Sequence, residues 1–166
     1  MTIYNHKFLI NNLNRKLKSI IYYHNKMYNL AKRNDVKEIQ KLDEKFISRI
    51  WEFTQIVFAL KEKLSQKYEK DINDINNLFN SNKRKGKVTA VGEVNQLANM
   101  WKHKENIEIY NNYSIEIKNG ISIFVNYEKR IADSGIPRKN NDRIIIILFK
   151  SCLKEIHTFC KEKNYI

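Results

Sequence analysis

The chain has 166 residues, of which 42% are hydrophobic and only one is Pro, and its 31 Lys and Arg against 18 Asp and Glu give a formal net charge of +13. This length and hydrophobic content are typical of one folded domain over residues 1–166 and exclude a disordered or low-complexity chain. The positive field favours an anionic partner such as nucleic acid, a membrane surface or an acidic protein. A composition rich in Ile, Asn and Lys is also what an A+T-rich genome would produce.

Two long amphipathic helices are expected first, over residues 6–33 and about 36–68. In each segment apolar residues recur at steps of three and four, which places them on one helix face. Asp35 lies at the break between them and is a good N-cap for the second helix. Two such helices joined by a short turn form an antiparallel hairpin, and each needs further helices to bury its apolar stripe.

A short helix is expected next, over residues 71–79, with Asp71 as its cap, and a third long helix over residues 88–103. Between them lies the segment SNKRKGK, residues 81–87, which is the densest cluster of positive charge in the sequence. Its four cations are Lys83, Arg84, Lys85 and Lys87.

Residues 107–127 change to a period of two, which is typical of strands. Asn119-Gly120 matches a type I′ hairpin turn, and Asn111-Asn112 is a candidate for a second turn. A basic loop over residues 129–141 and a last helix over about 142–163 complete the chain. The predicted fold is therefore mainly α, a four- to five-helix bundle with a small antiparallel β hairpin or meander (about 106–128) inserted before the last helix.

Several kinds of site are not indicated. The sequence has no glycine-rich phosphate loop, no HExxH and no Cys/His spacing suited to zinc, so no cofactor and no metal are expected. Cys152 and Cys160 are eight residues apart, about 12 Å along a helix, which is too far for a disulfide. No apolar run is long enough to span a membrane, and the first ten residues do not read as a signal peptide. We therefore expect a cytoplasmic protein with no membrane contact.

One polar cluster stands out at the end of the third long helix, over residues 95–104. Asn99 and His103 are four apart and share a helix face, while Asn99 and Lys102 are three apart. Polar residues also commonly terminate a helix, and the helix dipole favours cations such as Lys102 and Lys104 at its C-terminus. A purely structural role for this cluster therefore remains open beside a catalytic one.

The order of elements resembles HEPN-type helical proteins of prokaryotes and their mobile elements. The resemblance spans about residues 36–163 and rests on two short motifs, Phe79-Asn80-Ser81-Asn82 and Ala98-Asn99-Met100-Trp101-Lys102-His103. HEPN ribonucleases carry an Arg, then four to six residues, then a His. Their site usually forms across a dimer and needs no metal. The resemblance implies His103 as catalytic residue with Asn99 and Lys102 beside it, but Ala98 occupies the Arg position. Loss of that guanidinium argues against catalysis.

Three functions follow from these observations, and whether the protein is an enzyme stays open. The first is a noncatalytic module that binds RNA or another nucleic acid, in which Trp101, Tyr110 or Tyr113 would stack on bases if exposed. The second is a phage or mobile-element inhibitor that binds a nucleic-acid-handling protein. The third is a metal-independent endoribonuclease that uses His103. A homodimer is compatible with each. The expected nucleic-acid contacts are Lys83, Arg84, Lys85, Lys87, Lys102, Lys104, Arg130, Arg138, Lys139 and Arg143.

Overall fold

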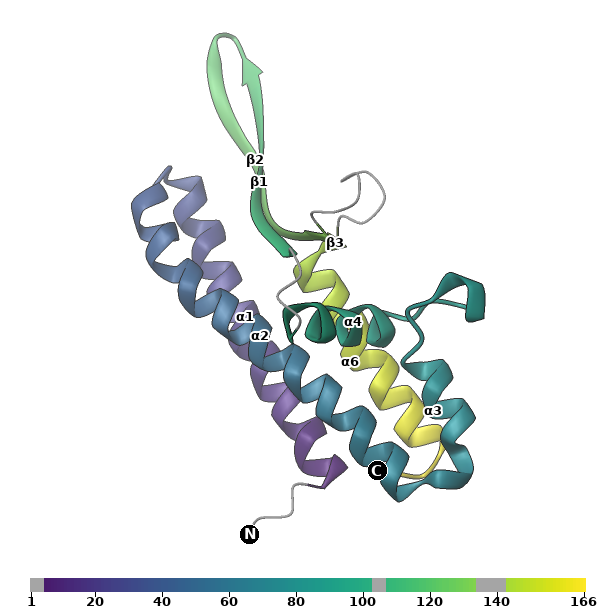
Figure 1. The fold of residues 1–166 in the computed structure, drawn as a ribbon. Helices are drawn as coiled ribbons and strands as arrows, with labels where there is room; N and C mark the ends of the chain where they lie inside the picture. The colour runs from purple at the N-terminus through teal and green to yellow at the C-terminus, as the bar shows by residue number, and fades with distance from the viewer. Residues whose placement is uncertain (1–4, 103–106, 134–142) are drawn as a thin grey trace.

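Two long antiparallel helices, α1 (His6–Lys32) and α2 (Val36–Lys67), form one side of the molecule in this computed structural model, which describes residues 5–102, 107–133 and 143–166 (Figure 1). Asn5 caps α1 by accepting a hydrogen bond from the Phe8 amide at 2.9 Å. Asp35 caps α2 in the same way through the Glu38 amide at 3.2 Å, as the sequence predicts. The apolar stripes of the two helices face the core, so both predicted helices are confirmed.

Two shorter helices, α3 (Ile72–Leu78) and α4 (Ala90–Lys102), follow, and α4 packs across α2 and α6. Single 3-10 turns precede them, η1 (Glu69–Asp71) before α3 and η2 (Lys83–Lys85) before α4. The prediction that Asp71 caps α3 is wrong, because its side chain makes no capping hydrogen bond. Instead its carboxylate accepts hydrogen bonds from the Tyr165 hydroxyl and from Lys163 near the end of the chain.

Three strands form an antiparallel sheet in the order β1 (Ile107–Lys118), β2 (Ile121–Asp133) and β3 (Arg143–Ile144). Asn119 and Gly120 both have positive φ, 52° and 75°, as a type I′ turn requires. The predicted turn at Asn111-Asn112 is wrong, because β1 runs through both residues. Asn111 lies opposite Lys129 in the ladder and accepts a hydrogen bond from the Tyr127 hydroxyl at 2.7 Å, which satisfies its side chain within the sheet.

The prediction of a loop from residue 129 is wrong for residues 129–133, because β2 continues through Asp133. Lys129 therefore lies inside a strand, and it is buried and ion-paired with Asp43 of α2 rather than part of a basic loop. Residues 134–142, which contain the predicted contacts Arg138 and Lys139, lie outside the described residues. The predicted hairpin is thus confirmed. The predicted third strand, before a turn at Asn111-Asn112, is wrong, because the third strand is β3 at Arg143–Ile144.

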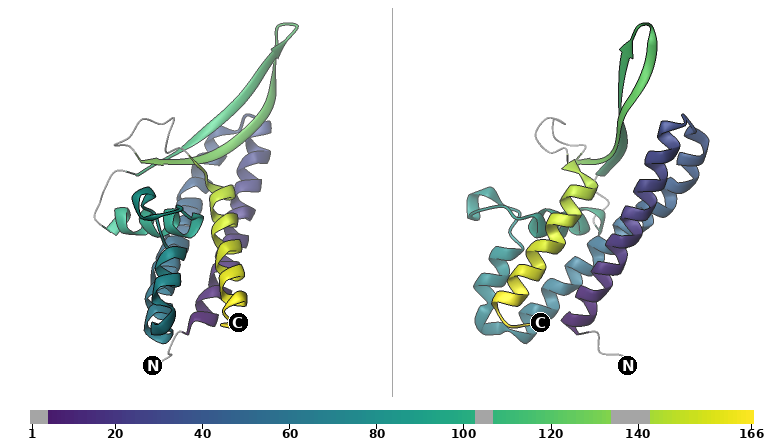
Figure 2. Two further views of the ribbon diagram at one scale, coloured as in Figure 1. Left: turned by 90° about the vertical axis from the view of Figure 1, so that its right-hand side faces the viewer. Right: turned by 180° about the vertical axis from the view of Figure 1, so that it is seen from behind.

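The last helix, α6 (Ile145–Glu162), starts three residues later than predicted, because Arg143 and Ile144 pair with β2. Its apolar face contacts α1 and α4, and Phe149 stacks on Phe53 of α2 with ring centroids 4.6 Å apart. The expected mainly α fold, a helical bundle with a small antiparallel sheet before the last helix, is confirmed. Figure 2 shows that the β1–β2 hairpin crosses one end of the bundle and extends beyond it. No helix within the described ranges combines the length and apolarity needed to cross a bilayer.

Candidate nucleic-acid interface

The segment between α3 and α4 presents four exposed cations, Lys83, Arg84, Lys85 and Lys87. We call residues 81–87 the basic loop. It contains no acidic residue, and none of its four cations forms an ion pair with a described residue. The structure therefore gathers these four predicted contact residues on one exposed protrusion.

Side-chain amides hold the basic loop in one conformation. The Asn80 amide nitrogen donates to the carbonyl oxygens of Asn82 (3.2 Å) and Lys87 (3.0 Å), at opposite ends of the loop. Its amide oxygen accepts from the Asn82 backbone at 3.0 Å. Asn82 in turn caps the turn η2 by accepting from the Arg84 amide at 2.9 Å. These bonds fix the loop at both ends before any ligand arrives, which lowers the entropy lost on binding.

The loop is also anchored to the bundle. Phe79 is buried in the core, and Thr89 donates its amide to the Asn80 carbonyl at 3.1 Å while its hydroxyl accepts from the Gly92 amide at 2.8 Å. Gly92 lies directly against the start of the loop, because a Cβ added there would come within 2.1 Å of the Asn80 carbonyl oxygen and 2.9 Å of the Ser81 amide nitrogen. The Phe79-Asn80-Ser81-Asn82 motif thus has a clear structural role, namely to attach and shape the loop.

A groove of about 520 Å³ runs beside the basic loop, and we call it the loop groove. Polar side chains of Ser81, Asn82 and Gln96 line it, together with three charged residues: Lys83 of the loop, Glu93 of α4 and Arg143 of β3. Its floor is apolar and comes from four separate segments of the chain: Val88, Leu97, Met100, Ile131, Ala132 and Leu148. A groove of this size, with an apolar floor and with both cations and one carboxylate in its lining, has room for a nucleotide-sized group.

A smaller cavity of about 350 Å³ adjoins this groove and shares Arg143 and Glu93 with it. Arg130 also lines the smaller cavity. Arg143 contacts Glu93 at 3.1 Å and Arg130 contacts Glu128 at 2.9 Å, so both guanidinium groups are oriented by carboxylates. The structure thus places Lys83, Arg143 and Arg130, three of the predicted contacts, in the linings of two adjoining cavities.

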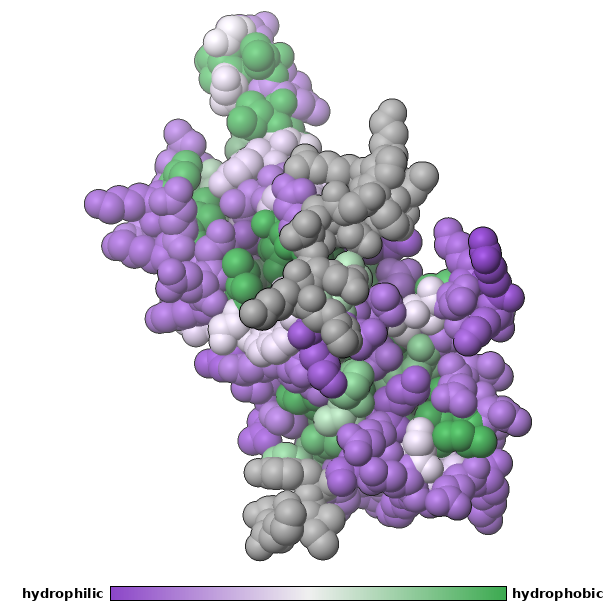
Figure 3. Space-filling view, viewed as in Figure 1, coloured by the Kyte–Doolittle hydropathy of each residue, from purple (hydrophilic) through white to green (hydrophobic). Residues whose placement is uncertain are grey.

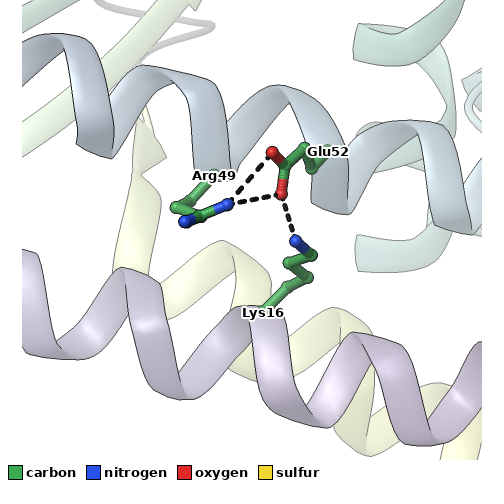
Figure 4. A network of polar contacts seen from close by, with 3 residues as sticks. All are labelled: Lys16, Arg49 and Glu52. Atoms are coloured by element: carbon green, nitrogen blue, oxygen red, sulfur yellow. Dashed lines mark hydrogen bonds and ion pairs between the residues drawn. The ribbon is translucent and has the colours of Figure 1, made fainter.

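Cations also occur elsewhere on the surface, along α1, α2 and α6, and several of them have acidic partners. Lys16 of α1 and Arg49 of α2 both contact Glu52 of α2 (Figure 4). Lys41 pairs with Glu38 on the same helix at 2.5 Å. The basic loop therefore differs from the rest of the surface in its density of charge and in its lack of acidic residues.

Of the residues predicted to be catalytic, Asn99 and Lys102 do not line the loop groove. Asn99 and Lys102 are both exposed on α4, and the Lys102 ammonium lies 5.6 Å from the centre of the Phe58 ring. Ala98, at the position where the HEPN motif has Arg, is buried. His103 and Lys104 lie outside the described residues, so their predicted roles stay predictions. Among the described residues, no cluster of His, Cys, Asp and Glu suits a metal ion.

The three aromatic residues considered as stacking platforms differ in their surroundings. Trp101 packs edge-on against Trp51 with centroids 5.0 Å apart and is only partly exposed. Tyr110 is half-buried on β1. Tyr113 is 41% exposed, and burial of the remainder of its ring raises the pKa of its hydroxyl. None of the three lines the loop groove, so an aromatic base platform is not part of this site.

Sequence reasoning missed Ser81, Asn82 and Gln96 as groove residues. Ser81 and Gln96 are fifteen positions apart and meet through a hydrogen bond of 3.4 Å. The only signal in the sequence was that Asn82 flanks the basic segment and that Gln96 lies in the polar cluster at residues 95–104. Comparisons of this chain with protein-family models, curated proteins and solved structures find no match, and the resemblance to HEPN proteins remains an expectation from short motifs.

Proposed function

We propose that this protein is a noncatalytic module that binds single-stranded nucleic acid, with RNA as the expected ligand, through the basic loop and the loop groove. The observation that carries the proposal is the set of four exposed cations on a hydrogen-bonded loop without acidic residues, beside a groove with an apolar floor whose lining includes Lys83, Glu93 and Arg143. Phosphates would contact the loop cations, and each such contact releases condensed counterions.

The groove favours single strands over duplexes. A base in a duplex is stacked and paired, so its apolar faces cannot enter a groove, whereas an unpaired base can be turned out of the strand. The aliphatic floor would contact the faces of such a base, and Ser81, Asn82 and Gln96 offer hydrogen bonds to its edge. Lys83 would contact the next phosphate along the strand, and Arg143, paired with Glu93 in the same lining, would offset the charge of that carboxylate.

Binding of a fluorescent single-stranded RNA, measured by anisotropy at two salt concentrations, tests the proposal. The triple variant Lys83→Ala, Arg84→Ala, Lys85→Ala removes three loop cations. We expect affinity at low salt to fall at least tenfold, and the slope of log affinity against log salt to drop by about two, since each contact with a single strand contributes about 0.7. A duplex of the same length should bind more weakly to the unaltered protein.

A matched variant distinguishes loss of the binding site from a general loss of positive charge. Arg33→Ala, Lys37→Ala, Lys45→Ala also removes one Arg and two Lys, all exposed, from the α1–α2 end of the molecule. It should change affinity only about twofold through the general field. Equal losses in the two triple variants, or no binding of the unaltered protein at low salt, would rule out the loop as the binding site.

An acidic surface of a nucleic-acid-handling protein is the second candidate ligand, as an inhibitor of the phage or mobile-element type would use. The Arg143–Glu93 pair supports it, because Arg143 already donates a hydrogen bond to a carboxylate in the lining of the groove. A complex with one purified protein that survives nuclease treatment and is lost in the loop triple variant would favour this candidate over nucleic acid.

A further inference from the structure

The distal part of the β1–β2 hairpin, residues 112–126, projects past the turn between α1 and α2, and we call it the arm (Figures 1 and 2). Its aliphatic side chains are unusually exposed for a soluble surface. Exposed fractions are 60% for Ile115, 76% for Ile117, 66% for Ile121, 42% for Ile123 and 45% for Val125. Figure 3 shows this apolar tip above a largely hydrophilic face of the bundle.

The arm is electrically neutral on a chain of net charge +13. Its only charged residues are Glu116 and Lys118, which pair with each other at 3.5 Å. The arm therefore offers no net electrostatic attraction to phosphates or acidic proteins, which the basic surfaces would bind instead. An apolar and uncharged partner surface suits it best, and a second arm is such a surface.

The arm also has an unpaired strand edge. In the sheet order β1-β2-β3, β1 is an edge strand, and β2 pairs with β3 only at Arg130 and Ile131. No described residue pairs with the outer edge of β1 over residues 112–118. An exposed edge with apolar side chains is a template for adding another strand.

Burial along β1 fixes the segment available for pairing. Residues 107–111 are half-buried against the bundle, while the seven residues 112–118 are exposed. The midpoint of the exposed segment is Ile115. We propose that two copies of this chain associate by antiparallel pairing of the outer edges of β1, with Ile115 on the two-fold axis.

This register is complementary to itself. Ile115 lies opposite the second copy's Ile115, and Tyr113 lies opposite the second copy's Ile117, so apolar side chains meet on one face. On the other face Glu116 lies opposite Ser114. Moving the axis by one residue, to Glu116, would place two carboxylates opposite each other and is disfavoured. The proposal is independent of nucleic-acid binding.

Analytical ultracentrifugation over a range of protein concentrations, without nucleic acid, tests the association. We expect a dimer that dissociates on dilution. Ile115→Lys places two ammonium groups opposite each other and should weaken the dimer at least tenfold. Ile121→Lys makes the same exchange at an equally exposed site on β2, away from the β1 edge, and should leave the dimer unchanged. Circular dichroism melting checks that both variants fold.

Disulfide trapping tests the register. Two Cα atoms directly opposite in an antiparallel pair are about 4.5–5.5 Å apart, within the range that a disulfide spans. Ile115→Cys should therefore form a covalent dimer on mild oxidation. Ile117→Cys should not, because residue 117 lies opposite residue 113 of the second copy, four residues from the second copy's residue 117. Cys152 and Cys160 are buried and give little background. A monomer at every concentration, an effect of Ile121→Lys equal to that of Ile115→Lys, or preferential trapping at Ile117→Cys would each overturn the proposal.

Discussion

Lys129 is one of the buried side chains that attach the hairpin to the helical bundle, beside Tyr127 and Ile131. It is 1% exposed, forms an ion pair with Asp43 of α2, and its ammonium group lies 5.9 Å from the centre of the Phe46 ring. Asp43 is 27% exposed, so water reaches only one member of the pair. A buried charge of this kind is costly to leave alone, and the pair therefore holds β2 at one position on α2.

Lys129→Ala should lower the free energy of unfolding by about 3 kcal/mol, because it removes a buried partner of Asp43 and leaves a cavity. Urea denaturation measures the change. Lys118→Ala, at an ion-paired Lys of the same hairpin with a side chain 68% exposed, should change stability by less than about 0.5 kcal/mol. Similar effects of the two substitutions would show that burial of Lys129 is unimportant.

Gly92 allows α4 to lie against the basic loop. Gly92→Ala puts a methyl group within 2.1 Å of the Asn80 carbonyl oxygen, so the loop must move. We expect a loss of about 1–3 kcal/mol of stability, typical of overpacking, and weaker RNA binding in the anisotropy assay. Asn99→Ala, at an exposed position of the same helix, is the control and should leave both measurements unchanged.

At the scale of elements, one carboxylate links the two long helices. Glu52 of α2 contacts Lys16 of α1 and accepts two hydrogen bonds from Arg49, at 3.0 and 3.1 Å (Figure 4). Burial raises the pKa of Glu52, but the hydrogen bonds from Lys16 and Arg49 outweigh it and the net pKa lies below its ordinary value of 4.5. The ionised carboxylate is therefore favoured in the folded state.

Glu52→Gln should reduce stability at pH 7 by about 0.5–1 kcal/mol, as for a partly exposed ion pair. Because the folded pKa is depressed, this contribution is complete above the unfolded value and is lost as the pH falls through the folded value. Thermal melts of the two proteins should differ at pH 7 and converge as the pH falls through the lowered pKa of Glu52. A difference that persists in acid would mean that packing, not charge, is responsible.

Elements with a strong local signal were predictable, and contacts between distant segments were not. The stripes of α1 and α2 and the Asn119-Gly120 turn follow from spacing and backbone conformation alone. The Asn111-Asn112 turn failed because the Tyr127 hydroxyl bonds to Asn111 across the sheet, which no local pattern reveals. The four loop cations were evident from density of charge. The groove beside them was not, since its walls come from α4, β2, β3 and α6.

At the scale of the whole molecule, the charged body and the neutral arm should respond to salt in opposite directions. Added salt screens phosphate contacts and weakens nucleic-acid binding. It also screens repulsion between two bodies of charge +13, so pairing of arms should strengthen. RNA anisotropy and sedimentation over the same salt series check both trends. A dimer that weakens with salt would indicate an association driven by charge instead of apolar contact.

The burial of Cys152 and Cys160 makes local opening of α6 measurable by thiol labelling. Both thiols lie on the buried face of α6, and burial raises the pKa of Cys160 to about 11 and that of Cys152 well above its ordinary value. Neither thiolate forms or meets a reagent while α6 stays packed. The rate at which an alkylating agent modifies each thiol therefore measures how often α6 opens. Cys152 reports on the middle of the helix and Cys160 on its end.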